Sequence, residues 1–541
     1  MKNIFFLAGL FLMTLSGCEM LDENPRSNID KSDYVKDASQ AESVLLGVYR
    51  GLSLEGTYGN NLSMLYDLTT DEAQCEGNSN VNFRAIPSGG FNSSHAEIER
   101  TWKELYASIY NATDFIEIAT RNMENFSEED RKLTEYYIAE AKVLRALFYF
   151  DLVRWFGHIV LVETTDESYL PNDGYEQAAP EKVYEFIEKD LLEAARVLPW
   201  ASDDLLRKDT AYRLSRGSAY GLLMKVYATW AGYPVHDTGK WAEVVKIGEI
   251  MTSSERHSLL PDFEQLWKDA GAAVWNPQEV LIAASFFNLT SGTPAGRIGK
   301  FNGVKADAIA GTRGSNGGYV KVLYPFIADW STKNDPRFDI SVASFNYKGT
   351  IKTSYSQKPI EDSASDIKNW QLCTPGKWDT EKYVPKSNLL IDANFSNISW
   401  YILRYADVLL LYAEAINETK KVPDATAYEM VNMVRRRGYG KDIHTADSSV
   451  DLPQGMGYEE FLAAIKQERS YELCFEGHRK QDLIRWGEYY ETVCATSQKL
   501  FALEGDANYV IMQYIQKGKN ELMPIPLREI DLMGLRQNDN W

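Results

Sequence analysis

Three glutamates spaced four residues apart are the first group in this sequence that could carry out chemistry. Glu468, Glu472 and Glu476 would share one face of a helix. Paired carboxylates perform glycoside hydrolysis, but there they flank the scissile bond from opposite sides of a cleft, about 5 Å apart in retaining enzymes and about 6.5–9.5 Å apart in inverting ones. Carboxylates stacked along one helix cannot straddle a sugar, so the spacing argues against a hydrolytic pair.

The same stretch supplies the cations that neighbouring carboxylates require. Arg469, Arg479 and Arg485 lie among or just after the glutamates. Like charges four residues apart on a helix repel each other, and opposite charges nearby offset that repulsion. We therefore interpret residues 468–485 as an ion-pair network that fastens two helices.

Other signatures of catalysis are missing from the sequence. It contains no G-x-S-x-G, H-E-x-x-H, G-x-x-x-x-G-K-[ST] or D-x-D-x-D-G motif. The glycine-rich stretch from Gly311 to Gly318 could be mistaken for a phosphate-binding loop, but it lacks the lysine and the helical pattern that should follow. We expect a flexible loop there and no catalytic residue.

Cysteine and histidine spacing predicts neither a metal site nor a disulfide framework. Beyond Cys18 the cysteines are Cys75, Cys373, Cys474 and Cys494. No two of them form a C-x₂₋₄-C pair, and the six histidines are scattered. We expect no metal and no cofactor, and mostly buried free thiols.

Amphipathic patterns at helical spacing run through most of the chain after Ala38. One apolar stripe comprises Tyr137, Ala141, Leu144, Phe148, Leu152 and Trp155. A second comprises Tyr405, Val408, Leu409, Tyr412, Ala413 and Ile416. Gly438 and Gly477 fit the left-handed position that ends a helix. These patterns predict a mostly α fold in which helical hairpins form a tetratricopeptide-like scaffold over 38–273 and 398–541.

Two stretches of the expected single domain, 38–541, lack this periodicity. Residues 66–95 and about 274–397 are rich in Gly, Ser, Thr, Asn and Pro, which predicts long loops with short strands. Loops supply variable surface while a rigid scaffold fixes their position. We therefore expect the larger insertion, 274–397, to carry ligand recognition.

The N-terminus has the pattern of an export signal. Lys2 precedes an apolar run from Ile4 to Leu15, and Ser16 and Gly17 lead directly to Cys18. The run is too short for a bilayer-spanning helix, which needs about 20 residues, so it indicates the apolar part of a signal peptide over 1–17. Residues 18–37 form a polar tether.

Net charge excludes several classes of partner. The chain has 57 basic and 77 acidic residues, a formal charge of −20. This charge repels the phosphates of nucleic acid and the headgroups of anionic lipids. We expect no nucleic-acid partner, and membrane attachment must come from a specific anchor.

The pair of small residues before Cys18 resembles the lipobox of bacterial lipoproteins, which implies lipid attachment to the Cys18 sulfur. The acidic residues Glu19, Asp22 and Glu23 that follow resemble the export signal of surface lipoproteins in the Bacteroidetes. Together these resemblances imply a lipoprotein on the surface of the outer membrane.

Several motifs farther along resemble the SusD/RagB family. The run from Glu468-Arg469 through Glu476-Gly477-His478-Arg479 to Arg485-Trp486-Gly487 resembles the family signature E-R-x-x-E-L-x-x-E-G-x-R-x-x-D-L-x-R-W-G. Further matches are Glu140–Gly157, Arg404–Ala415 and the ending Met523-Pro524-Ile525-Pro526 with Gln537-Asn538. The chain departs from the family at Met533-Gly534, where Asn-Pro is usual, and in its last residue, Trp541.

This resemblance implies a fold of four tetratricopeptide-type hairpins with a loop-rich insertion. It implies a protein that captures oligosaccharides and delivers them to a SusC-like TonB-dependent transporter, for which it acts as a hinged lid. The family motifs are mostly scaffold and do not mark the ligand site.

The ligand site has to be sought among aromatic and polar residues of the irregular segments. A sugar presents apolar C–H faces and hydroxyl edges, so it needs flat aromatic surfaces beside polar groups. The candidates are Tyr66, Asn80, Phe83, Arg84, Phe91, Trp275, Tyr319, Trp330, Trp370 and Trp378. Any single aromatic residue belongs to the core more often than to a site, whereas three on one exposed surface would indicate a site.

Two alternatives remain open from the sequence. A surface glycoside hydrolase would release new reducing ends from its glycan. A helical-repeat adaptor without a small ligand would keep the loop tryptophans buried, and their fluorescence would not respond to any glycan.

Overall fold

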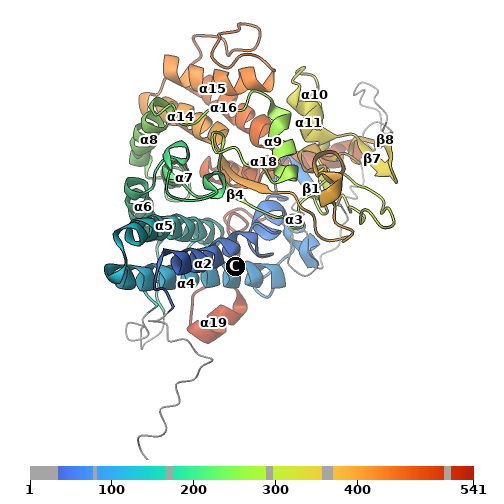
Figure 1. Cartoon of the computed structure of the whole chain (residues 1–541). Coiled ribbons are helices and arrows are strands. Elements are labelled where there is room, and N and C mark those ends of the chain that lie inside the picture. Colours follow the sequence, from blue (N-terminus) through green and yellow to red (C-terminus); the bar gives the residue numbers. More distant parts are fainter. Residues whose placement is uncertain (1–33, 77–81, 166–174, 288–295, 356–368, 505–512) are drawn as a thin grey trace, which may run out of the picture.

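The computed structural model of the protein describes residues 34–76, 82–165, 175–287, 296–355, 369–504 and 513–541. Helices dominate these residues and the strands are short, which confirms the predicted mostly α fold. Figure 1 shows a broad stack of helices beside a smaller lobe that contains β7 and β8. Within the described ranges, no helix combines the length and the apolar character needed to cross a membrane.

The longest helices form an antiparallel hairpin. α4 (Ala96–Asn122) is followed by α5 (Glu128–Phe156), and α2 (Ala38–Tyr49) packs against both. α5 begins where the Ser127 side chain accepts a hydrogen bond from the Asp130 amide, and it ends at Gly157, whose φ of 70° no helical residue adopts. The apolar stripe predicted from Tyr137 to Trp155 lies on this helix and is buried.

A row of further helices continues from this hairpin. α6 (Pro180–Val197), α7 (Arg216–Ala231) and α8 (Trp241–Ser253) each pack against the helix before. α14 (Tyr405–Lys420) packs on α7 and α8, and it also contacts α15 (Ala425–Gly438) and α16 (Tyr458–Leu473). Helices from both predicted scaffold segments, 38–273 and 398–541, therefore pack around one shared core. The predicted stripe on α14 is buried in this core.

The remaining helices are shorter and frame the loops. They are α3 (Ala85–Ser88), α9 (Phe263–Ala272), α10 (Tyr324–Ser331), α11 (Arg337–Ser341), α13 (Thr380–Tyr383), α17 (Arg479–Arg485), α18 (Tyr489–Glu504) and α19 (Leu527–Met533). In Figure 1, α19 lies below α4, apart from the other C-terminal helices.

Small antiparallel sheets tie the loops to the scaffold. β4 (Val280–Ala284) pairs with β10 (Trp400–Arg404), and β2 (Ile159–Val160) pairs with β3 (Gln177–Ala178). The other pairs are β6 (Val342–Ala343) with β9 (Thr374–Pro375) and β7 (Phe345–Lys348) with β8 (Ile351–Ser354). β1 (Ala73–Cys75) pairs with β5 (Val320–Val322), which joins the two irregular segments of the sequence.

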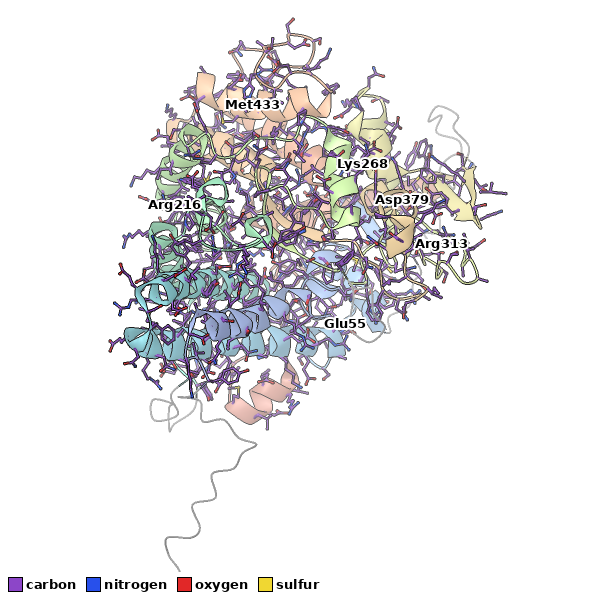
Figure 2. The ribbon with its side chains drawn as sticks, in the orientation of Figure 1. Glu55, Arg216, Lys268, Arg313, Asp379 and Met433 are labelled. Atoms are coloured by element: carbon purple, nitrogen blue, oxygen red, sulfur yellow. The ribbon has the colours of Figure 1, made fainter. Side chains whose placement is uncertain are left out.

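The glycine-rich loop at 311–318 is held in place by Arg313. The Arg313 side chain is buried, donates to the carbonyls of Asp307 and Gly349, and forms an ion pair with Glu381. Figure 2 shows Arg313 and Asp379 in the same lobe, on the side that carries β7 and β8. The loop prediction holds, but a buried arginine gives this loop fixed contacts where the sequence suggested flexibility.

Two other predictions concern the left-handed glycines and the free cysteines. Gly477 has the predicted left-handed backbone, with a φ of 78°, but it lies beyond the end of α16 at Leu473 and does not end that helix. Gly438 is the last residue of α15, and the left-handed position falls at Gly440 instead. Cys75, Cys373 and Cys474 are buried free thiols, and Cys494 is half-buried and free. The signal peptide, Cys18 and most of the tether lie outside the described residues.

Candidate functional site

The three glutamates on α16 and just beyond it lie in a buried network of ion pairs. Glu472 accepts hydrogen bonds from Arg337 and Arg404, each at 3.0 Å, and from Arg437. Glu476 pairs with Arg404 at 2.7 Å and with Lys377 at 2.8 Å. All these side chains are at most 1% exposed. The predicted network is confirmed, but its cations come from other parts of the chain.

The arginines named from the sequence bind different carboxylates. Arg469 donates to Asp407 at 2.7 Å and to Asp482 at 2.9 Å, and Arg485 binds Glu414 at 2.6 Å. Arg479 reaches back to Asp71 at 2.8 Å. These partners join α14, α16 and α17 to the loop before β1. They correct the expectation that the three nearest arginines neutralise the three glutamates.

This network cannot act as a general acid. Burial alone raises the pKa of Glu472, but the guanidinium groups of Arg437, Arg404 and Arg337 outweigh burial and lower that pKa to about 2. A carboxylate that stays ionised near neutral pH and has no solvent access holds helices together. It has no proton to give to a leaving group.

A partly exposed aromatic cluster forms where the two irregular segments meet. The ring of Phe83 lies 4.9 Å from Phe301 and 6.2 Å from Tyr319, measured between ring centroids. Phe301 and Tyr319 are 5.4 Å apart. The guanidinium carbon of Arg84 lies 4.9 Å from the Phe83 centroid and 5.7 Å from that of Tyr319. We call these four residues the aromatic cluster.

Backbone pairing next to β1 and β5 positions the aromatic cluster. The Glu76 amide donates to the Tyr319 carbonyl at 2.6 Å, and the Tyr319 amide donates to the Phe301 carbonyl at 2.9 Å. Arg84 Nε donates to the Glu76 carbonyl at 3.0 Å. Tyr319 is 38% exposed, Phe83 and Arg84 are half-buried, and Phe301 is 6% exposed. Phe301 is thus the buried support for the other rings.

An open hollow of about 490 Å³ adjoins the aromatic cluster. Its lining includes Phe83, Phe91, Asn92, His95 and Glu97, so it runs from the cluster to the start of α4. The ring of Trp541 lies 5.0 Å from that of Phe91 and backs it from the C-terminus. The hollow therefore combines aromatic faces with amide, imidazole and carboxylate groups. We call it the first hollow.

The structure gathers some of the predicted site residues here and places others in the core. Phe83, Arg84 and Tyr319 meet in the aromatic cluster, and Phe91 lines the first hollow while being 7% exposed. Asn80 lies outside the described residues.

The other aromatic candidates lie elsewhere. Tyr66, Trp330 and Trp378 are fully buried, with their rings against Trp155, Tyr471 and Trp400 respectively. Trp275 and Trp370 are half-buried at separate places, Trp275 beside Tyr212 and Trp370 beside the small cluster around Leu323. The three fully buried rings offer no free face for stacking.

Phe301 is the member of the cluster that sequence reasoning missed. It lies in a stretch without periodicity, between Lys300 and Asn302. Its proximity to Phe83 depends on the β1–β5 pairing, which joins distant segments. No local signal could have identified it. Among the described residues, no group of three or more His, Cys, Asp or Glu side chains is arranged to hold a metal ion.

Comparison with known proteins identifies the family. Residues 324–541 match the sequence model of the SusD family, and residues 19–228 match that of a family described as starch-binding associating with outer membrane. SusD-like protein P2 of Formosa agariphila is 25% identical over 495 residues, which cover 88% of this chain and 89% of that protein.

Solved structures share the fold over nearly the full length. A laminarin-binding SusD-like protein is 21% identical, with a TM-score of 0.68, over 94% of this chain and 100% of that one. A SusD homologue from Bacteroides thetaiotaomicron is 48% identical, with a TM-score of 0.90, over 95% of this chain and 99% of that one. The protein therefore belongs to the SusD family.

Proposed function

We propose that this protein captures oligosaccharides at the cell surface and passes them intact to a SusC-like TonB-dependent transporter, for which it acts as a lid. The observation that carries the proposal is the aromatic cluster beside the first hollow. Rings of Phe83 and Tyr319 suit the C–H faces of a sugar, and Arg84, Asn92 and Glu97 are placed to bind its hydroxyl groups.

The carboxylates near the first hollow favour binding over hydrolysis. Glycoside hydrolysis needs two carboxyl groups facing each other across the bond. Glu97 is the one carboxylate among the described residues that line the first hollow, and it already accepts hydrogen bonds from Arg100 at 3.1 Å and Asn61 at 3.2 Å. A single carboxylate that two donors hold in place can accept a hydrogen bond from a sugar hydroxyl, but it has no second carboxyl group with which to hydrolyse the glycan.

Capture at an open site implies weak binding. Much of the ligand stays hydrated, so we expect Kd values around 10⁻⁴ to 10⁻⁵ M, which correspond to about −5.5 to −7 kcal/mol. Weak binding also suits delivery, because a ligand held at nanomolar strength would dissociate too slowly to supply a transporter.

The binding test uses the mature chain with Cys18→Ser, titrated calorimetrically with oligosaccharides from laminarin, starch, mannan, xylan and pectin. We expect Phe83→Ala and Tyr319→Ala each to weaken the binding of the active glycan about threefold to tenfold, because each removes a stacking face. Trp275→Ala and Trp370→Ala test the other half-buried candidates and should leave the Kd unchanged. Leu205→Ala, at a side chain 94% exposed, is the surface control.

Two results would contradict the binding proposal, and a third would place the binding site elsewhere. Absence of binding to every glycan at millimolar concentration would leave the adaptor alternative. New reducing ends after incubation with the protein would favour the hydrolase. An affinity that falls only with Trp275→Ala or Trp370→Ala would move the site away from the aromatic cluster.

Membrane attachment has its own test. We propose that an acyl chain on Cys18 holds the protein on the outer membrane, since a chain of net charge −20 has no general affinity for an anionic surface. Cys18→Ser should move the protein from the detergent phase to the aqueous phase in Triton X-114 partitioning of labelled cells, whereas Cys494→Ser should not. Retention of the Cys18 variant in the detergent phase would contradict this anchor.

A further inference from the structure

Three hollows lie along α4, the helix that Figure 1 shows with α19 below it. The first hollow lies at the helix start. A second, of about 450 Å³, lies between Ser94 and Glu99 on one side and Arg528 of α19 on the other. A third, of about 360 Å³, begins at Trp102 and Lys103. Their linings include His95, the N-cap of α4, and Glu99, Lys103, Tyr106 and Tyr110 of α4, at steps of four, four, three and four.

The third hollow, which we call the aromatic pocket, has rigid aromatic walls. Trp102 and Tyr106 contact each other with ring centroids 4.9 Å apart. The Tyr106 hydroxyl donates to the Val160 carbonyl at 3.0 Å and accepts from the Val160 amide at 2.8 Å, which fixes the ring against β2. Tyr110 and Tyr175 complete the lining on the outer side, and Tyr110 is 44% exposed.

Polar side chains of both signs lie between the second hollow and the aromatic pocket. Glu99 pairs with Lys103 on α4 and lies 3.6 Å from Arg528 of α19. These side chains are 30%, 42% and 56% exposed, so their remaining hydrogen-bonding capacity faces water. Glu529 lines the aromatic pocket itself. The path therefore offers donors and acceptors next to aromatic faces, the combination that an uncharged sugar requires.

We propose that the aromatic pocket is a second carbohydrate subsite, which holds a sugar unit of the same glycan that the aromatic cluster binds. The proposal rests on the proposed function and adds that the ligand is an extended oligosaccharide of several units lying along α4. From Glu97 to Tyr110 the helix advances about 20 Å at about 1.5 Å per residue, so one short sugar cannot reach both sites. Along the path, Lys103 and Arg528 face Glu99, Glu529 and Asp531, and this small excess of negative charge disfavours an acidic glycan and selects an uncharged one.

Occupancy of the aromatic pocket can be observed directly through Met533, which lines it. The full mature chain with Cys18→Ser is labelled with ¹³C-methyl methionine, and Met533→Leu assigns the Met533 resonance. The probes are length series of gluco-, manno- and xylo-oligosaccharides from two to eight units. We expect the Met533 methyl to shift only with the longer members of the series that binds.

Two substitutions separate the subsites. Tyr110→Ala should weaken binding of the long oligosaccharides about threefold to tenfold and leave the short ones unchanged, because it removes one stacking face. Phe83→Ala should weaken both. Tyr34→Ala, at a tyrosine 51% exposed and outside the path, is the matched control. Glu529→Gln provides a second variant of the aromatic pocket that preserves its shape.

The results distinguish the two proposals. Glycan binding that depends on Phe83, with no Met533 shift and no length-dependent loss in Tyr110→Ala or Glu529→Gln, would overturn the second subsite and keep the proposed function. No binding of any series, together with an unchanged Met533 resonance, would overturn both. A Met533 shift that appears with long chains and disappears in Tyr110→Ala would establish the extended site.

Discussion

Gly438 leaves room for the buried guanidinium group of Arg337 because its side chain is a single hydrogen atom. A Cβ at this position would lie 2.5 Å from the guanidinium carbon of Arg337, which is fully buried between Asp335, Glu468 and Glu472. Since the backbone at Gly438 is helical, the glycine serves the close approach of Arg337 and has no role in a left-handed turn.

We predict that Gly438→Ala lowers the free energy of unfolding by about 1–3 kcal/mol, because the methyl group overpacks against a side chain that cannot move without losing its ion pairs. Denaturant unfolding followed by far-UV circular dichroism measures the change. Gly47→Ala is the matched control. It lies in α2, where an added methyl group would meet nothing within 4 Å, and it should raise stability by about 0.5–1 kcal/mol. Equal effects of the two substitutions would contradict the role of Arg337.

The sequence predicts the kinds of residue in the network but not their pairing. Three glutamates at helical spacing require cations, and that inference holds. The actual partner Arg337 is 131 residues from Glu468 in sequence, and Glu279 and Arg404 are 125 residues apart. Such pairs depend on the packing of whole elements, so nearest-neighbour reasoning chose the wrong arginines. The candidate site follows the same rule, because Phe83 and Tyr319 meet only through the β1–β5 pairing.

At the scale of elements, long periodic segments were predictable and short pairings were not. α5 and α14 carry apolar stripes over several turns, and both stripes are buried as expected. β1 and β5 have three residues each, too few for any periodicity to be read, yet they join the two loop segments that form the aromatic cluster. The element that creates the candidate site is thus the one with the weakest sequence signal.

Hydrogen bonds from Met523 and Asn538 attach the C-terminal segment to the end of α5, where the Met523 amide donates to the Trp155 carbonyl at 2.6 Å. Asn538 Nδ2 donates to the Phe156 carbonyl at 3.0 Å and to the Met523 carbonyl at 2.9 Å, and the residue is 8% exposed. These bonds satisfy a carbonyl at the end of α5 that has no helical partner. They also hold the segment that leads to α19, which forms one side of the second hollow.

We predict that Asn538→Ala lowers the free energy of unfolding by about 1–3 kcal/mol, since it leaves two buried carbonyls without a donor. Limited proteolysis should cut the segment after Met523 sooner in this variant than in the wild type. Arg536→Ala, at an exposed neighbour, should leave both measurements unchanged. Loss of global stability with no change in the cleavage rate of this segment would argue against a local attachment.

At the scale of the whole molecule, buried titratable groups make the stability of the helical scaffold depend on pH. His478 Nδ1 lies 2.7 Å from Lys225 Nζ, which also binds Asp407 at 2.7 Å. Burial, followed by the charge of Lys225, lowers the pKa of His478 to about 3, although Asp407, Glu476 and Asp482 act in the opposite direction. Folding therefore keeps this histidine neutral with its Nδ1 facing an ammonium group.

The carboxylates of the ion-pair network affect the stability of the fold at lower pH. The arginines around Glu472 hold its pKa at about 2, and those around Asp482 hold its pKa at about 2 as well. Because these values lie below those of unfolded carboxyl groups, near 4, the stabilisation is present above about pH 4 and is lost as the pH falls toward 2. Burial raises the pKa of Asp67 and of Asp379 to about 6, and these two groups oppose the trend.

Because Asp67 and Asp379 act in the opposite direction, the contribution of His478 has to be measured as the difference in stability between the wild type and His478→Asn. Below about pH 6.5 the unfolded chain binds a proton at this histidine that the folded chain does not, so stability falls as the pH falls from about 6.5 toward about 3. We predict that the wild type loses about 2 kcal/mol more than His478→Asn between about pH 6.5 and pH 5, because asparagine cannot titrate. Urea unfolding at several pH values measures both curves, and His444→Asn, at an exposed histidine, should follow the wild type. Parallel curves for the wild type and His478→Asn would mean that His478 titrates alike in the folded and unfolded chain, and that burial beside Lys225 does not set its protonation.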